Sequence, residues 1–241
     1  MTTRQALALL GLLAVRVGPS TLTAQEPSSY AVAAIGRQCL EFKDLDAREC
    51  QVSESGALGT VGNRTLLYAL YCIIPNWTKD GTRCGGESFE AGYHRARALA
   101  VFSRDDGQPT ALLLFVRAEP EIGILHYEKP QIIHNPAGTI LHLPIVVDGT
   151  GHGNSSEYYL ASNGEWERIE AESWLKAVVS QLPPGLEIWK GIWPDLETMT
   201  ARTGLYRHGD GNCCPTGGSA RIHLSIRDRR FVLDSLVVEK P

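Results

Sequence analysis

Residues 220–238 read ARIHLSIRDRRFVLDSLVV, and this stretch decides the fold class. Apolar residues occupy every second position of its first half, a period of two that predicts a strand with one buried face. The Asp228-Arg229 pair supplies a tight turn, and Phe231–Val238 is a β-branched and aromatic return strand. The sequence therefore predicts an antiparallel β-hairpin over these residues.

The segment directly before this hairpin, residues 204–219 (GLYRHGDGNCCPTGGS), is rich in glycine and contains one proline. Such residues interrupt regular secondary structure, so we expect an irregular loop held over the sheet. Loops held in this way often carry binding or catalytic side chains. The adjacent cysteines Cys213 and Cys214 lie in the middle of this loop.

Strand patterns dominate the rest of the chain as well. Two further hairpins are predicted, one from 97–103 and 110–117 around a DDGQ turn, the other from 131–134 and 139–147 around an NPAG turn. An apolar run predicts a buried strand at Thr65–Ile74, whereas polar, glycine-bearing sequence predicts mostly loop at 43–63. Shorter strands are expected at 157–161, 186–192 and 198–207.

One amphipathic helix is predicted at about residues 170–182. Its apolar residues recur at helical spacing along one stripe: Ala171, Trp174, Leu175, Val178 and Leu182. Glutamates near its start suit the N-terminal end of the backbone dipole, and a Pro-Pro-Gly sequence ends it. We therefore expect an α+β fold, mainly antiparallel sheet with β-hairpins, with the helix packed on one face.

The first 24 residues have the pattern of a signal peptide. Arg4 supplies the charged start, Ala6–Val15 an apolar run, and Ala24 a small residue before the cleavage point. The apolar run is too short to cross a membrane, so we expect a secreted or periplasmic protein without a membrane span. Cys39 is the first cysteine, too far from the cleavage point to serve as a lipid anchor.

Length and charge bound what remains. The chain after residue 24 is long enough for a well-formed core, as an N-terminal β-rich part at 25–147 and a C-terminal α+β part at 148–241, or as one continuous domain. The whole chain carries a net charge of −4 at pH 7, with positive and negative residues scattered along it. Such a chain is poorly suited to binding nucleic acid or an anionic membrane.

The cysteines indicate a disulfide framework. An even number behind a signal peptide favours disulfide bonds over free thiols. The six positions are Cys39, Cys50, Cys72, Cys84, Cys213 and Cys214. Proximity in sequence suggests the pairs Cys39–Cys50 and Cys72–Cys84. Cys213 and Cys214 then bond to each other, or one of them exchanges with the first half of the chain.

A catalytic alternative exists in the same C-terminal loop. A cysteine nucleophile needs an imidazole to take its proton and a third group to orient that ring. His208, Asp210, and Cys213 or Cys214 supply these residue types within seven positions. The same residues with His223 are legitimate zinc ligands, but no CxxC or HxxxH spacing supports a metal site, so neither a metal nor a cofactor is predicted.

Ligand-binding candidates lie in two loops. Residues 148–156 (DGTGHGNSS) follow a predicted strand without leading into a helix, so they resemble a ligand loop or a linker more than a phosphate loop. The candidate residues are Asp148, His152, Asn154 and Tyr206. With Trp189 and Trp193, Tyr206 either stacks on a sugar or an aromatic ligand or belongs to the core. The ligand is then a protein, a glycan or a small molecule.

Two histidines in the third hairpin do not form a chelating pair. If the NPAG turn is the loop, His134 pairs with Thr139 and Gln131 pairs with His142. Alternation then places the two imidazoles on opposite faces of the sheet. We therefore expect no metal site between them.

The sequence GDGNCCPTGG at 209–218, followed by a hairpin, resembles a C-terminal element of poorly characterised secreted and lipid-anchored bacterial proteins. The resemblance covers about the last 35 residues. It implies an envelope location and a loop-plus-hairpin structure, and no activity. The favoured interpretation is a secreted or periplasmic, disulfide-containing binding or structural module. Its expected functional surface combines residues 148–156 and 206–218. The alternative is a secreted hydrolase that uses the His/Asp/Cys set, and the number of free thiols distinguishes the two.

Overall fold

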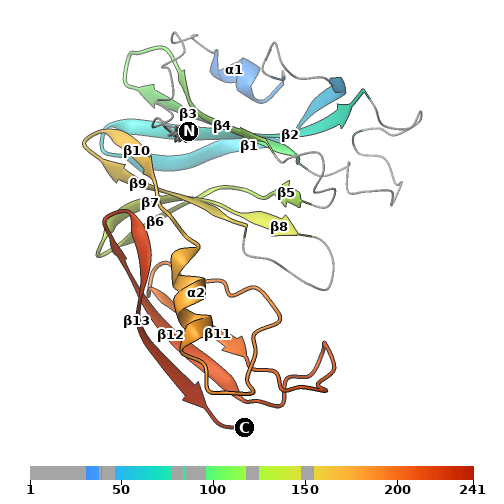
Figure 1. Ribbon diagram of the computed structural model, residues 1–241. Helices are drawn as coiled ribbons and strands as arrows, with labels where there is room; N and C mark the ends of the chain where they lie inside the picture. The colour runs from blue at the N-terminus through green and yellow to red at the C-terminus, as the bar shows by residue number, and fades with distance from the viewer. Residues whose placement is uncertain are drawn as a thin grey trace, which may run out of the picture.

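Antiparallel β-sheets make up most of the computed structural model (Figure 1). It describes residues 31–37, 39, 47–76, 84, 96–117, 125–147 and 155–241. The first sheet has the order β1-β2-β3-β4, with these strands at Ala47–Val61, Arg64–Pro75, Ala98–Asp105 and Ala111–Arg117. The second sheet has the order β10-β9-β7-β6, with β6 at Gln131–Asn135, β7 at Gly138–Leu143, β9 at Glu157–Ser162 and β10 at Glu165–Arg168.

The C-terminal residues form a third sheet with the order β11-β12-β13. Its strands are β11 at Thr200–Gly204, β12 at Ser219–Arg227 and β13 at Arg230–Glu239. A small two-stranded sheet pairs β5, Leu125–Tyr127, with β8, Ile145–Val147. The helices are α1, Val32–Ile35, and α2, Ser173–Ser180. The prediction of a mainly antiparallel, β-rich fold is confirmed.

The elements stack in layers that bury three apolar clusters. Figure 1 shows α1 over the first sheet, the second sheet below it, and α2 with the third sheet at the other end. The cluster between the first two sheets includes Leu99 of β3 and Leu141 of β7. Because strand side chains alternate, Ile140 faces the opposite way and packs in the cluster with α2 and the third sheet. The outer face of the first sheet packs with Ile35 of α1.

The C-terminal hairpin forms as its alternation predicts. Arg227 pairs with Arg230, and Asp228 and Arg229 both have positive φ, 49° and 58°. A turn whose two central residues have positive φ matches the right-handed twist of the flanking strands, so these two residues alone connect β12 to β13. The apolar positions of β12 at Ala220, Ile222 and Leu224 are buried, whereas the intervening polar residues are exposed.

Two sequence-based predictions of local structure are wrong. Within the predicted loop at 43–63, residues Ala47–Val61 form strand β1. The sequence does not show this strand because β1 lies at the edge of its sheet, where most of residues 54–60 remain exposed. Register irregularities at Val52/Glu54 and Ala57/Gly59 also break its alternation. Residues 186–192 form no strand in the structure. They make a single isolated bridge, Glu187 to Tyr206, two residues after β11 ends.

Helix α2 is shorter than the predicted 170–182. Glu170 pairs with the C-terminal hairpin instead: its N–H donates to Arg229 O at 2.8 Å, and its carbonyl accepts from Phe231 N–H at 3.0 Å. These bonds hold the backbone extended until the helix begins at Ser173. Trp174 and Val178, the inward positions of the predicted stripe, are both buried.

The second sheet draws strands from both sides of residue 148, because β7 pairs with β9. Leu141 and Tyr159 are partners in this pairing. The chain therefore passes from its first part to its second within a single sheet. No helix in the part of the chain that the structure describes is long and apolar enough to cross a membrane.

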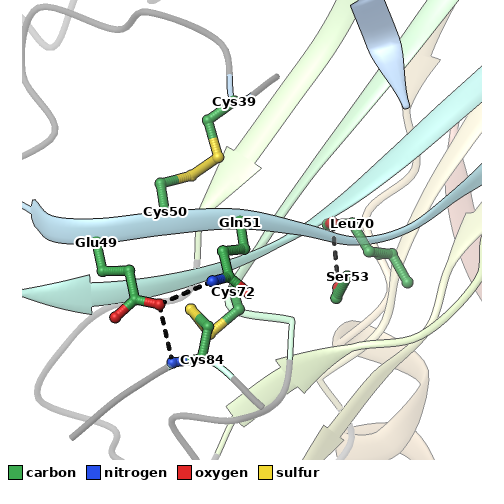
Figure 2. The surroundings of a disulfide bond; sticks show 8 residues. All are labelled: Cys39, Glu49, Cys50, Gln51, Ser53, Leu70, Cys72 and Cys84. Carbon is green, nitrogen blue, oxygen red and sulfur yellow. Dashed lines mark hydrogen bonds between the residues drawn. A yellow bond between two sulfur atoms is a disulfide. The ribbon is translucent and has the colours of Figure 1, made fainter. Parts of the chain in front are cut away.

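All six cysteines are bonded, in the pairs Cys39–Cys50, Cys72–Cys84 and Cys213–Cys214. The prediction of a disulfide framework is confirmed. In Figure 2 the first two bonds lie on opposite sides of β1. Glu49 adds hydrogen bonds beside the second disulfide, because its Oε1 accepts from the Cys84 N–H at 3.4 Å and from Gln51 Nε2 at 3.0 Å.

Candidate functional site

A cavity of about 420 Å³ lies where β9, β10 and the start of α2 meet. We call it the α2 cavity. Side chains of both polar and apolar character line it, including Ser156, Tyr158, Arg168, Glu170, Glu172 and Trp174. A concave site with an apolar floor and a few polar groups is the usual form of a small-ligand site.

The floor of the α2 cavity is fixed by core packing. Tyr158 is buried, with its ring 5.0 Å from that of Phe231 in an edge-on arrangement. Trp174 is also buried, and its Nε1 donates to Ala171 O at 3.0 Å. Since the indole N–H is satisfied within the protein, Trp174 presents apolar surface to the cavity. The floor is therefore rigid and apolar.

The rim of the α2 cavity is charged and partly pre-organised. Glu170 Oε1 accepts from the N–H groups of Glu172 and Ser173 at 2.6 and 2.9 Å. Hydrogen bonding from Ser173, with the Glu172 backbone and Arg230 also contributing, lowers the pKa of Glu170. Glu170 therefore carries a negative charge at neutral pH and also satisfies free amides at the start of α2.

Arg168 supplies the positive charge on this rim. Its Nε lies 4.0 Å from Glu157 Oε2, and its side chain is 70% exposed. The same Glu157 oxygen accepts from the Tyr159 hydroxyl at 2.7 Å. Within the described part of the chain, the carboxylate of Glu172 has no hydrogen-bond or ion-pair partner. Arg168 and Glu172 are therefore the rim groups that are most available to a ligand.

His142 lies beneath the same floor. Its ring stacks on Tyr158 at a centroid distance of 4.8 Å, with the ring planes 14° apart. Nδ1 lies 3.4 Å from Gln131 Oε1, and Nε2 is buried with no hydrogen-bond partner among the residues described. Burial lowers the pKa of His142 to about 4. A neutral imidazole is therefore the form that the fold accommodates.

This burial predicts an acid-dependent loss of stability. Because the folded pKa of His142 lies below the ordinary value of 6.5, the unfolded chain takes up the proton first as the pH falls. The stabilisation is present above pH 6.5 and declines between pH 6.5 and about 4, by roughly 3 kcal/mol. His142→Phe should keep the ring stack and lose this pH dependence.

Urea unfolding of the wild type and His142→Phe at closely spaced pH values measures the effect. The difference between the two proteins cancels the titration of carboxylates that both share. His134→Phe is the matched control, because His134 is exposed on the neighbouring strand β6. If the slope persists in His142→Phe, or disappears in His134→Phe, the interpretation of His142 is wrong.

The structure does not place the ligand candidates from the first loop. Asp148, His152 and Asn154 lie outside the described residues. Ser155 and Ser156, at the end of that loop, line the α2 cavity. These two serines thus form part of the cavity wall. Residues 206–218, its expected companion, contribute none of the side chains that line the cavity.

The catalytic candidates of the C-terminal loop are near in sequence but are not arranged as a nucleophile and base. Cys213 and Cys214 are bonded to each other, so neither sulfur is a thiolate. Asp210 accepts from Arg207 N–H at 2.7 Å, from Thr216 N–H at 2.9 Å and from Thr216 Oγ1 at 2.7 Å. These hydrogen bonds, most of all the one from the Arg207 backbone N–H, lower the pKa of Asp210.

Asp210 therefore organises the loop backbone instead of orienting an imidazole. His208 is exposed and makes no hydrogen bond to it in the structure. In the ranges that the structure describes, no group of three or more His, Cys, Asp or Glu side chains gathers to hold a metal ion.

Tyr206 links this loop to an aromatic pair. It is buried, its ring stacks on Trp189 at 4.4 Å and 14°, and its hydroxyl donates to Asn212 O at 3.1 Å. Trp189 is 37% exposed, and its Nε1 donates to Glu187 Oε2 at 2.7 Å. Tyr206 is thus a support for Trp189 and the loop, and its own ring is not free to stack on a ligand.

Sequence reasoning missed the rim of the α2 cavity, namely Arg168, Glu170 and Glu172. The available signal was the dense charge of residues 165–172, EWERIEAE, between a turn and the helix. Charged runs usually mark a solvated face, so this composition did not distinguish a cavity rim from an ordinary surface.

No known protein family matches the sequence, and no curated protein matches it. Among solved structures, one similar chain is a polysaccharide lyase described as PL25 ulvan lyase bound to -[GlcA(1-4)Rha3S]-. The identity is 12% and the TM-score 0.35, over 83% of this chain and 45% of the lyase chain. This chain therefore spans less than half of that structure, and a similarity at this level supports no conclusion about function.

Proposed function

We propose that the chain is an exported, disulfide-stabilised binding module that takes a small polar ligand in the α2 cavity. The proposal rests on the cavity itself, which has a volume of about 420 Å³, an apolar floor and a charged rim. This volume falls within the usual range for small-ligand sites. Its floor is made by core residues that cannot rearrange freely, so the site is formed before a ligand arrives.

The charges on the rim indicate the kind of ligand. Three glutamates but only one arginine are among the residues that line the cavity, so negative charge predominates: Glu157, Glu170, Glu172 and Arg168. Such a rim favours a ligand rich in hydrogen-bond donors, with hydroxyl or ammonium groups, over an anion. A sugar unit has this chemistry, because its hydroxyls reach the rim while its ring rests on the floor.

Export is supported by two independent features. Residues 1–24 have the pattern of a signal peptide. Three disulfides fit a compartment outside the reducing cytosol. The hydrolase alternative has less support, because it requires a free sulfur in the C-terminal loop and both sulfurs there are bonded.

Amide chemical shifts of the full chain test the proposal, with glucosamine, glucose and glucuronate as probes. These share a pyranose ring and differ in charge. We expect shifts in residues 155–158 and 168–174, and affinity in the order glucosamine, glucose, glucuronate. Arg168→Ala should weaken glucose binding about tenfold, because a charge-assisted hydrogen bond is worth roughly 1.5–3 kcal/mol.

Arg202→Ala is the matched control for this variant. Arg202 also lies on a strand, its side chain is 68% exposed against 70% for Arg168, and it pairs with Glu239 in the third sheet. Its replacement should leave binding unchanged. Equal weakening by both variants, strongest binding by glucuronate, or no shift in the two segments would contradict the proposal.

A further inference from the structure

The Cys213–Cys214 bond differs from the other two disulfides in exposure. Both of its cysteines are exposed. Cys72, in contrast, is 1% exposed within β2. Cys39 and Cys50 are half-buried and pack against the apolar cluster on the outer face of the first sheet. An attacking thiol can therefore approach the Cys213–Cys214 sulfurs without disturbing the core.

Stabilisation does not account for this bond. The sequence separations of the other two disulfides are 11 and 12, whereas that of Cys213–Cys214 is 1. The stabilisation from a cross-link grows with the length of the chain it closes. A bond between neighbouring residues therefore restricts the unfolded chain very little.

The surrounding loop is held by bonds that do not involve sulfur. Asp210 joins Arg207 to Thr216 through both backbone N–H groups. Arg207 Nη1 donates to Thr216 O at 2.7 Å, and the N–H of Cys214 donates to Gly211 O at 2.9 Å. Opening the disulfide therefore leaves the base of the loop in place.

We propose that Cys213–Cys214 is a thiol–disulfide exchange site for a dithiol reductant. A thiolate of the dithiol attacks one cysteine sulfur, the S–S bond breaks, and the released cysteine sulfur takes a proton from water. The second thiol of the reductant then attacks the mixed disulfide and releases the other cysteine. One disulfide passes to the reductant, and two electrons and two protons pass to Cys213 and Cys214.

A dithiol suits this site better than a monothiol. Its second thiol is tethered at high effective concentration, so it resolves the mixed disulfide before the neighbouring cysteine closes the bond again. Reduction also reaches an aromatic reporter: the Tyr206 hydroxyl holds the carbonyl of Asn212, next to Cys213, and the Tyr206 ring supports Trp189. We therefore expect a change in tryptophan emission when the bond opens.

Graded reduction of the native full chain tests the inference. The protein is incubated with increasing dithiothreitol, alkylated with N-ethylmaleimide and digested, and the alkylated cysteines are identified by mass spectrometry. Cys213 and Cys214 should react at a dithiothreitol concentration at least tenfold lower than Cys72 and Cys84, with unchanged far-ultraviolet circular dichroism. Glutathione at equal thiol concentration should open the bond less completely.

Three results would overturn the inference. These are earlier opening of either other disulfide, opening of all three together with loss of circular dichroism, and equal reduction by glutathione. The variant Cys213→Ser/Cys214→Ser adds an independent check, because it should melt within a few degrees of the wild type. A large loss of melting temperature would show that the bond is a structural staple. None of these outcomes depends on ligand binding in the α2 cavity.

Discussion

Replacing Phe231 by alanine is expected to lower the free energy of unfolding by about 3–5 kcal/mol, the usual cost of truncating a buried phenylalanine. Phe231 is 1% exposed, and it packs edge-on against Tyr158 of the second sheet. Its N–H also donates to the carbonyl oxygen of Glu170, three residues before the start of helix α2. The side chain thus joins the third sheet to the second beneath the α2 cavity.

Urea unfolding measures this loss, and Val237→Ala is the matched control. Val237 lies on the same strand, β13, but is 51% exposed, so its truncation should cost well under 1 kcal/mol. Phe231→Ala should also loosen the cavity floor, since Tyr158 loses its edge-on partner. A loss below about 1 kcal/mol for Phe231→Ala would mean that the third sheet does not depend on this contact.

The second large effect is expected at Gly218. This residue has φ +93°, and a Cβ added there would lie 2.1 Å from Glu239 O, a backbone atom at the end of β13. Neither the backbone angle nor the contact can be relieved by rotating a side chain. Gly218→Ala should therefore destabilise the protein by about 3 kcal/mol or more, as the sum of left-handed strain and overpacking.

Gly209→Ala isolates the steric part of this cost. Gly209 has almost the same angle, φ +92°, with no atom within 4 Å of an added Cβ. It should lose only the backbone term, about 1–2 kcal/mol. Equal losses at the two positions in urea unfolding would show that the clash at Gly218 is absent. Both the positive φ and the close contact with Glu239 O require a glycine at position 218, directly before β12 begins.

The C-terminal hairpin could be predicted because its information is local. Alternation in 220–227 specifies the buried face, and the Asp228-Arg229 turn specifies the register. The edge strand β1 could not be predicted in this way, since an exposed strand with register irregularities carries no period-two signal. Residues 186–192 are the opposite case, because their sequence has a strand pattern but only one isolated bridge, Glu187 to Tyr206, forms there.

The α2 cavity could not be predicted, because it depends on tertiary packing. Arg168 and Trp174 both line the cavity only because Glu170 is held against β13 and helix α2 starts three residues later than the predicted residue 170. Of the predicted ligand loop at 148–156, the described residues Ser155 and Ser156 line the cavity, whereas the candidates Asp148, His152 and Asn154 stay predictions. The disulfide pairs followed proximity in sequence, a local rule, and the structure has the same pairs.

The proposals of export and of the exchange site both require that the six cysteines are oxidised. The most direct test of this requirement is intact-mass and peptide-mapping analysis of acid-quenched protein from cells expressing the full sequence. We predict protein outside the cytosol that begins at Gln25, is six hydrogens lighter than its reduced form, and carries the three disulfides described above. Cytosolic protein that retains residues 1–24 and six free thiols would contradict it.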